Sequence, residues 1–78
     1  MARLRLFGPA REAAGTAACE LPGTTVAEVL AGATARFGED FARVLDRAKV
    51  WVNGTEFPPE HPVGPDDEVA VLPPVSGG

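Results

Sequence analysis

The chain has 78 residues, a single cysteine and a formal net charge of −4, with 11 acidic side chains against 7 basic ones. This length allows one small hydrophobic core and no deep catalytic cleft, so a carrier, module or subunit is favoured over a complete enzyme. The acidic balance argues against nucleic-acid binding and for a basic protein partner. A lone Cys19 excludes an internal disulfide, and neither Cys19 nor the lone His61 has neighbouring residues that would complete a metal site.

Hydropathy excludes a membrane-spanning helix, because no apolar run approaches the required length. The start of the sequence, residues 1–7, lacks the long apolar region and cleavage site of a signal peptide. We therefore expect a cytoplasmic protein with no membrane partner.

Hydrophobic spacing predicts short strands on both sides of one main helix. Residues that alternate with period two, bounded by turn signals, define the strands. The expected strands are 3–6, 17–21, 49–53, 55–57 and 68–72. Gly8 and Pro9 break the first strand, and Asn53 with Gly54 is typical of the type I′ turn of a hairpin.

The main helix is expected to begin at a capping box. Thr25 would satisfy a free amide of the first turn, and Glu28 would reach back to the cap. Apolar residues then recur at helical spacing as far as Gly38, a natural stop. Residues 41–45 predict one or two further helical turns on the same core.

The order of these elements predicts an α+β fold of the β-grasp (ubiquitin-like) type for residues 1–72. A mixed sheet of four to five strands would be covered on one face by one main helix. The first and last strands would pair in parallel at the centre of the sheet, because the helix between the hairpins provides the crossover. Residues 73–78 would form an extended tail.

Strict alternation assigns four apolar residues to the sheet face that the helix leaves open: Phe7, Trp51, Ala70 and Leu72. An exposed apolar patch usually marks a partner surface, and Trp is favoured at binding hot spots. The alternative is a reversed register with Trp51 in the core, because Val flanks it on both sides.

The tail ends in Gly77 and Gly78. Pro73 and Pro74 cannot donate ladder hydrogen bonds, so they should end the last strand and favour an extended course. Six extended residues reach about 20 Å, enough to enter the active site of another protein. A terminal glycine passes through a narrow channel and leaves its carbonyl open to attack. The alternative is a frayed terminus, and composition alone does not choose between the two.

Several segments resemble the MoaD family, the sulfur-carrying small subunit of molybdopterin synthase within the MoaD/ThiS ubiquitin-like superfamily. Together with the order of elements, the resemblance covers nearly the whole chain, and the tail is its most specific part. The resembling segments are 6–16 (LFGPAREAAGT), 52–54, 61–63 and, above all, 67–78 (DEVAVLPPVSGG).

The resemblance implies that an adenylating enzyme of the ubiquitin-activating type uses ATP to convert the Gly78 carboxylate into an acyl adenylate, and that a sulfur donor turns it into a thiocarboxylate. The tail would then enter the large subunit of molybdopterin synthase, in an expected heterotetramer, and give sulfur to cyclic pyranopterin monophosphate. Gly77, Pro74 and Pro73 would guide the tail. The chain itself would bind no cofactor and no metal, and would be inert alone.

The same resemblance places Phe7, Leu72 and Arg11 at the interface with the large subunit. For Arg11, a solvated charge paired with an acid such as Glu12 explains the residue equally well. Three other functions stay open: a sulfur carrier for thiamine or cysteine biosynthesis, a ubiquitin-like modifier joined to target lysines, and an interaction domain whose tail has no role.

Overall fold

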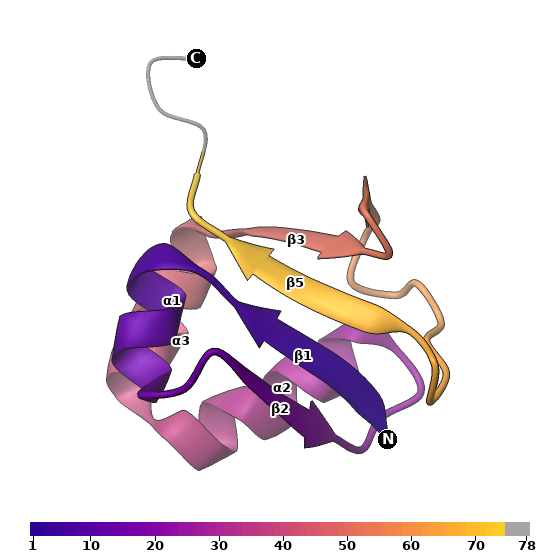
Figure 1. The fold of residues 1–78 in the computed structure, drawn as a ribbon, viewed down its shortest axis with the longest axis horizontal. Coiled ribbons are helices and arrows are strands. Elements are labelled where there is room, and N and C mark those ends of the chain that lie inside the picture. Colours follow the sequence, from indigo (N-terminus) through magenta and orange to yellow (C-terminus); the bar gives the residue numbers. More distant parts are fainter. Residues whose placement is uncertain (75–78) are drawn as a thin grey trace.

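The computed structural model describes residues 1–74, which form a five-stranded sheet and three helices (Figure 1). The strands are β1 (Ala2–Leu6), β2 (Ala18–Leu21), β3 (Lys49–Val52), β4 (Thr55–Glu56) and β5 (Glu68–Leu72). The helices are α1 (Gly8–Ala14), α2 (Val26–Phe37) and α3 (Glu39–Arg47). The predicted site residues Gly77 and Gly78 lie outside the described residues.

The sheet is mixed, with the strand order β2-β1-β5-β3-β4. β1 and β5 pair in parallel, and the other neighbours pair antiparallel. The first and last strands therefore lie side by side at the centre, which confirms the predicted α+β, β-grasp arrangement. Figure 1 shows α2 and α3 behind the sheet and α1 across one end of it, so one face stays open.

The hydrophobic core lies between the sheet and the helices. Leu4 and Leu6 of β1 and Val69 and Val71 of β5 are at most 1% exposed, because alternate residues of a strand point to the same face. They belong to one buried cluster with Phe41 of α3, which is fully buried. The predicted sheet register is confirmed by these residues.

The cap of α2 follows the prediction with one difference. The Thr25 hydroxyl accepts a hydrogen bond from the backbone N–H of Glu28 at 3.2 Å. The Glu28 carboxylate reaches back one residue further than a standard capping box, and it accepts from the N–H (2.7 Å) and the hydroxyl (2.9 Å) of Thr24. These bonds hold the pKa of Glu28 below its ordinary value of 4.5.

Helix α1 is absent from the sequence-based prediction, which treated Gly8 and Pro9 only as a break. Pro9 lies in the first turn of the helix, where its missing N–H leaves no hydrogen bond unmade. Gly15 ends the helix with a φ of 75° and donates its N–H to the carbonyl of Arg11 at 2.9 Å. Ala10 is 1% exposed, so this short helix packs into the core.

The second hairpin has the predicted turn, with positive φ values of 50° at Asn53 and 86° at Gly54. The Asn53 side chain also holds the following loop, because its amide donates to the Asp67 carboxylate at 2.9 Å and its oxygen accepts from the N–H of Glu68 at 3.0 Å. Asp67 also accepts from the N–H of Gly64 at 2.8 Å, and these bonds, the Gly64 bond first, lower the pKa of Asp67. The loop is thereby fixed to the start of β5.

Candidate functional site at the root of the tail

The tail begins at the end of β5, which is held on both sides by β1 and β3. The ladder continues to the last residues, since the N–H of Phe7 donates to the carbonyl of Val71 at 3.1 Å. Pro73 and Pro74 follow and are exposed. A central strand thus fixes the position from which the tail departs, while the prolines offer no N–H for further pairing.

An apolar patch, which we name the sheet patch, lies on the open face beside this point. It consists of the four predicted residues Phe7, Trp51, Ala70 and Leu72. Phe7 and Trp51 are each 38% exposed, and Ala70 and Leu72 are half-buried. Trp51 lies directly opposite Ala70 in the register of β3 and β5. The predicted position of Trp51 on the open face is confirmed, and the alternative of Trp51 in the core is wrong.

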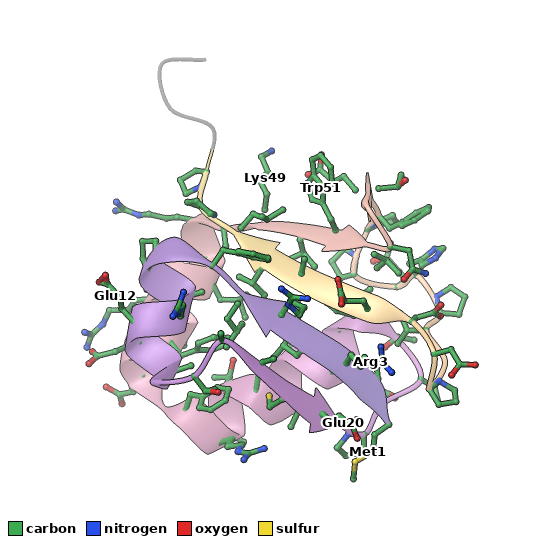
Figure 2. All side chains as sticks on the ribbon, in the orientation of Figure 1. Met1, Arg3, Glu12, Glu20, Lys49 and Trp51 are labelled. Carbon is green, nitrogen blue, oxygen red and sulfur yellow. The ribbon has the colours of Figure 1, made fainter. Side chains whose placement is uncertain are left out.

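Two ion pairs flank the sheet patch. Arg5 lies 3.6 Å from Glu68, and Lys49 lies 3.6 Å from Glu56. The Arg5 guanidinium also lies 5.7 Å from the centre of the Phe7 ring. Figure 2 shows Lys49 and Trp51 projecting from β3 to the same side. Exposed pairs of this kind contribute little to folding stability.

A groove of about 530 Å³ opens next to the tail root, and we name it the root groove. It lies between the start of α1, the end of α3 and the first residues after β5, which meet at one end of the sheet in Figure 1. Its apolar lining includes Pro9, Ala10, Val44, Ala48, Pro73 and Pro74. Phe7 and Leu72 also line it, so the sheet patch and the root groove share a border.

Arg11, which the family resemblance places at an interface, lies exposed on α1. It forms no salt bridge with Glu12 or any other described residue. It lines neither the sheet patch nor the root groove. Its place at an interface stays a prediction.

Cys19 and His61 stand apart from the tail root. Cys19 is half-buried in β2, and burial raises the pKa of its thiol, an effect that nearby Arg36 partly offsets. His61 stacks on Phe57 with ring centres 3.8 Å apart. Within residues 1–74 no group of three metal-ligating side chains occurs.

None of the helices in the described part of the chain is long and apolar enough to cross a bilayer.

The root groove is the part of this region that sequence reasoning missed. Its walls come from three segments far apart in the chain, and one of them is the unpredicted helix α1. The available signal was the GPAR segment at residues 8–11, where Pro next to an alanine and charged residues also suits a helix start.

These features define a ubiquitin-like β-grasp domain whose central last strand leads into a proline-containing C-terminal segment. A family model described as the ThiS family matches residues 4–78. The chain belongs to this family of ubiquitin-like sulfur carriers. No curated protein matches the chain in a sequence comparison.

Solved structures agree with this assignment. The small archaeal modifier protein 1 of Methanosarcina acetivorans is 28% identical with a TM-score of 0.88, over 99% of this chain and 95% of that one. A putative molybdopterin converting factor, subunit 1, from Pyrococcus furiosus is 26% identical with a TM-score of 0.80, over 95% and 97%. The fold also matches the Amycolatopsis orientalis BexX/CysO complex, at 24% identity and a TM-score of 0.82, over 100% of both chains.

Proposed function

We propose that this chain is the sulfur-carrying small subunit of molybdopterin synthase and that Gly78 is the residue that bears the sulfur. The observation that carries the proposal is the exposed sheet patch at the point where the central strand of a sulfur-carrier fold releases the tail. A partner that binds the patch is in position to receive the residues that follow Pro73 and Pro74.

The proposed chemistry uses the terminal carboxylate in three steps. A carboxylate oxygen of Gly78 attacks the α-phosphate of ATP in the activating enzyme, which releases pyrophosphate and leaves an acyl adenylate. Sulfide supplied by a sulfur donor then attacks the carbonyl carbon, forms a C–S bond, displaces AMP and loses its proton. The resulting thiocarboxylate offers sulfur as the nucleophile toward cyclic pyranopterin monophosphate in the large subunit. Because adenylation consumes ATP, we place the carrier in the cytoplasm.

The residues of the tail suit this role. Gly77 and Gly78 add no side chain that would block a narrow channel. Pro73 and Pro74 favour an extended course through it. The partner supplies the groups that activate and transfer the sulfur, and the carrier supplies the sheet patch, with Phe7, Trp51, Ala70 and Leu72, as its binding surface. We extend this interface to Arg11 on the strength of the family resemblance alone.

Two observations favour molybdopterin over the thiamine and cysteine pathways. The segments 6–16 and 67–78 resemble the MoaD family, and thiamine carriers resemble this chain less, because they tend to be shorter and lack the long proline-rich approach to the final strand. The similar Pyrococcus furiosus protein is described as a putative molybdopterin converting factor subunit. Both support the assignment of the pathway by similarity.

A protein modifier is the second candidate, because the small archaeal modifier protein 1 is 28% identical over 99% of this chain. The two functions share the adenylation step and differ in the acceptor. A modifier ends in an amide bond to a lysine of a target protein, whereas a carrier ends in a thiocarboxylate.

Intact-mass measurement of the protein purified from its own host tests the proposal. We expect the mass change of one oxygen replaced by one sulfur, confined to the C-terminal peptide, and co-purification of a large synthase subunit. A matched Gly78 deletion should lose the mass change. A branched peptide that joins Gly78 to a target lysine, with no thiocarboxylate, would favour the modifier instead. Co-purification with a thiamine or cysteine enzyme would reassign the pathway.

A further inference from the structure

We propose that the root groove is a second docking surface, which seats an apolar segment of the large synthase subunit flanked by an acidic side chain. The inference rests on the proposed function and adds a site that the sheet patch does not include. It concerns the region beside the tail root between α1 and α3.

The shape of the groove fits an apolar anchor. Ala10 and Ala48 are small and leave the space open, while Val44 supplies an apolar wall. Pro73 and Pro74 form the wall on the side of the tail. Binding hot spots commonly place one large side chain into such a pocket beside a rigid element. A volume of about 530 Å³ accommodates an aromatic or leucine side chain of a partner with its neighbours.

The charges at the rim select an acidic neighbour for that anchor. Arg43 is occupied within α3, since it lies 3.7 Å from Glu39 and 2.9 Å from Asp40. Arg47, one turn further along the helix, also lines the groove and forms no salt bridge with a described residue. A guanidinium pairs well with a carboxylate through two parallel hydrogen bonds. The rim thus carries an available cation although the chain as a whole has a net charge of −4.

Asp46 is the acidic member of the lining. It disfavours a partner carboxylate beside it, so the favourable position for that carboxylate is at the Arg47 guanidinium. The two opposite charges therefore restrict where the acidic side chain of the partner segment can lie.

The size of the sheet patch argues that a lasting partner needs more surface. A stable interface buries about 800 Å² on each partner. The whole surface of this domain is 4741 Å², and the sheet patch offers two side chains that are 38% exposed and two that are half-buried. Under the proposed function, the chain and the large subunit form a heterotetramer, and such an assembly needs more surface than the sheet patch offers. We therefore assign the groove to the large subunit.

The two surfaces are also continuous. Phe7 and Leu72 belong to the sheet patch and line the groove as well. Pro73 and Pro74 pass between them. A protein whose channel takes the tail surrounds the tail root, so it contacts both surfaces at once.

The test measures the affinity of purified large subunit for the full-length carrier by calorimetry at low and high salt. Arg47→Glu reverses the rim charge, and Ala48→Trp fills the groove. Arg36→Glu is the matched control, because it makes the same charge change on α2 at a residue that does not line the groove. We expect a loss of about tenfold or more for each groove variant and about twofold or less for the control. The loss for Arg47→Glu should shrink at high salt, since an exposed ion pair is screened.

The outcomes separate the two proposals. Wild-type affinity in Arg47→Glu overturns the groove inference while the proposed function stands; this exposed variant decides the matter even if Ala48→Trp does not fold. The groove inference is also overturned if the groove variants slow pyrophosphate release by the activating enzyme but bind the large subunit like the wild type. The groove would then serve the activating enzyme. A wild-type carrier that binds no large subunit refutes the proposed function and the inference with it.

Discussion

Lys49 and Leu72 lie opposite each other in the antiparallel pair of β3 and β5, at the last register position before the tail. Lys49 is the only lysine of the sequence, and it pairs with Glu56 at 3.6 Å. The single lysine ε-amine of the chain therefore stands at the tail root, beside the sheet patch. Any protein joined to Lys49 would cover the surface that we assign to the partner, so we expect no functional chains linked through this residue.

Leu72→Asp should weaken binding to the large subunit by about tenfold or more, because it places a charge in the sheet patch. Leu72 is half-buried on the open face, so the free energy of unfolding should fall by only about 1 kcal/mol. Chemical denaturation and calorimetry measure the two effects. Val71→Asp is the control on the opposite face, where the side chain is fully buried, and it should unfold the domain. A folded Val71→Asp beside an unfolded Leu72→Asp would contradict our assignment of the sheet faces.

Deletion of Gly78 should abolish thiocarboxylate formation and leave the thermal midpoint unchanged. The last buried residue of the described core is Val71, seven positions before Gly78. Mass spectrometry after incubation with ATP, the activating enzyme and a sulfur donor reports the modification, and circular dichroism reports the fold. Full sulfur loading of the shortened chain would show that Gly78 is not the carrier residue.

Glu28→Gln should remove one source of acid sensitivity. The pKa of Glu28 is lowered in the folded protein, mainly by the N–H and hydroxyl of Thr24, so ionised Glu28 stabilises the fold above its ordinary pKa of 4.5. This stabilisation is lost as the pH falls through the lowered pKa of the folded state. The difference in unfolding free energy between wild type and Glu28→Gln should thus be largest near neutral pH and shrink in acid.

Thr25→Ala provides the comparison for that experiment, because it removes the other half of the cap. It should cost about 1 kcal/mol at neutral pH. Denaturant titrations between neutral and acidic pH measure both variants. A gap between wild type and Glu28→Gln that widens in acid would contradict the role of the Glu28 carboxylate.

Phe41→Ala should destabilise the domain strongly, with a loss of about 3–5 kcal/mol in the free energy of unfolding. Phe41 is fully buried and packs against Phe37 with ring centres 5.3 Å apart. Since small domains are stable by only roughly 5–15 kcal/mol, this loss brings the fold close to its limit. Phe57→Ala, at a half-buried ring in the loop, should cost distinctly less in the same denaturant titration. If Phe41→Ala and Phe57→Ala lose the same free energy of unfolding, Phe41 of α3 contributes less to the core than the burial of its side chain indicates.

Much of the sheet could be predicted because its residues repeat a simple pattern. Leu4 and Leu6 in one strand, and Val69 and Val71 in another, alternate with more polar or smaller neighbours, so their side chains share the buried face. The same alternation placed Trp51 on the open face, where the structure has it. These predictions depend only on the spacing of apolar residues within each strand, which a single sequence shows directly.

The root groove could not be predicted because it is a product of tertiary packing. Ala10, Val44 and Pro73 come from three separate segments, and nothing in their spacing states that they meet. The available charge of Arg47 was equally hidden, since Asp46 precedes it in the sequence and only the structure shows that the two do not pair. The chemistry of Gly77 and Gly78 stays a prediction, because both lie beyond the described residues.

The strand order limits how the domain can fold while the ribosome synthesises it. β5 is the last of the described strands in the chain, yet it is the one that joins β1 to β3 in the finished sheet. Until it emerges from the exit tunnel, β1 and β3 each lack the neighbour on that side, so the two hairpins cannot form one sheet. A prematurely terminated product that lacks β5 would therefore expose the edges of β1 and β3 to proteases.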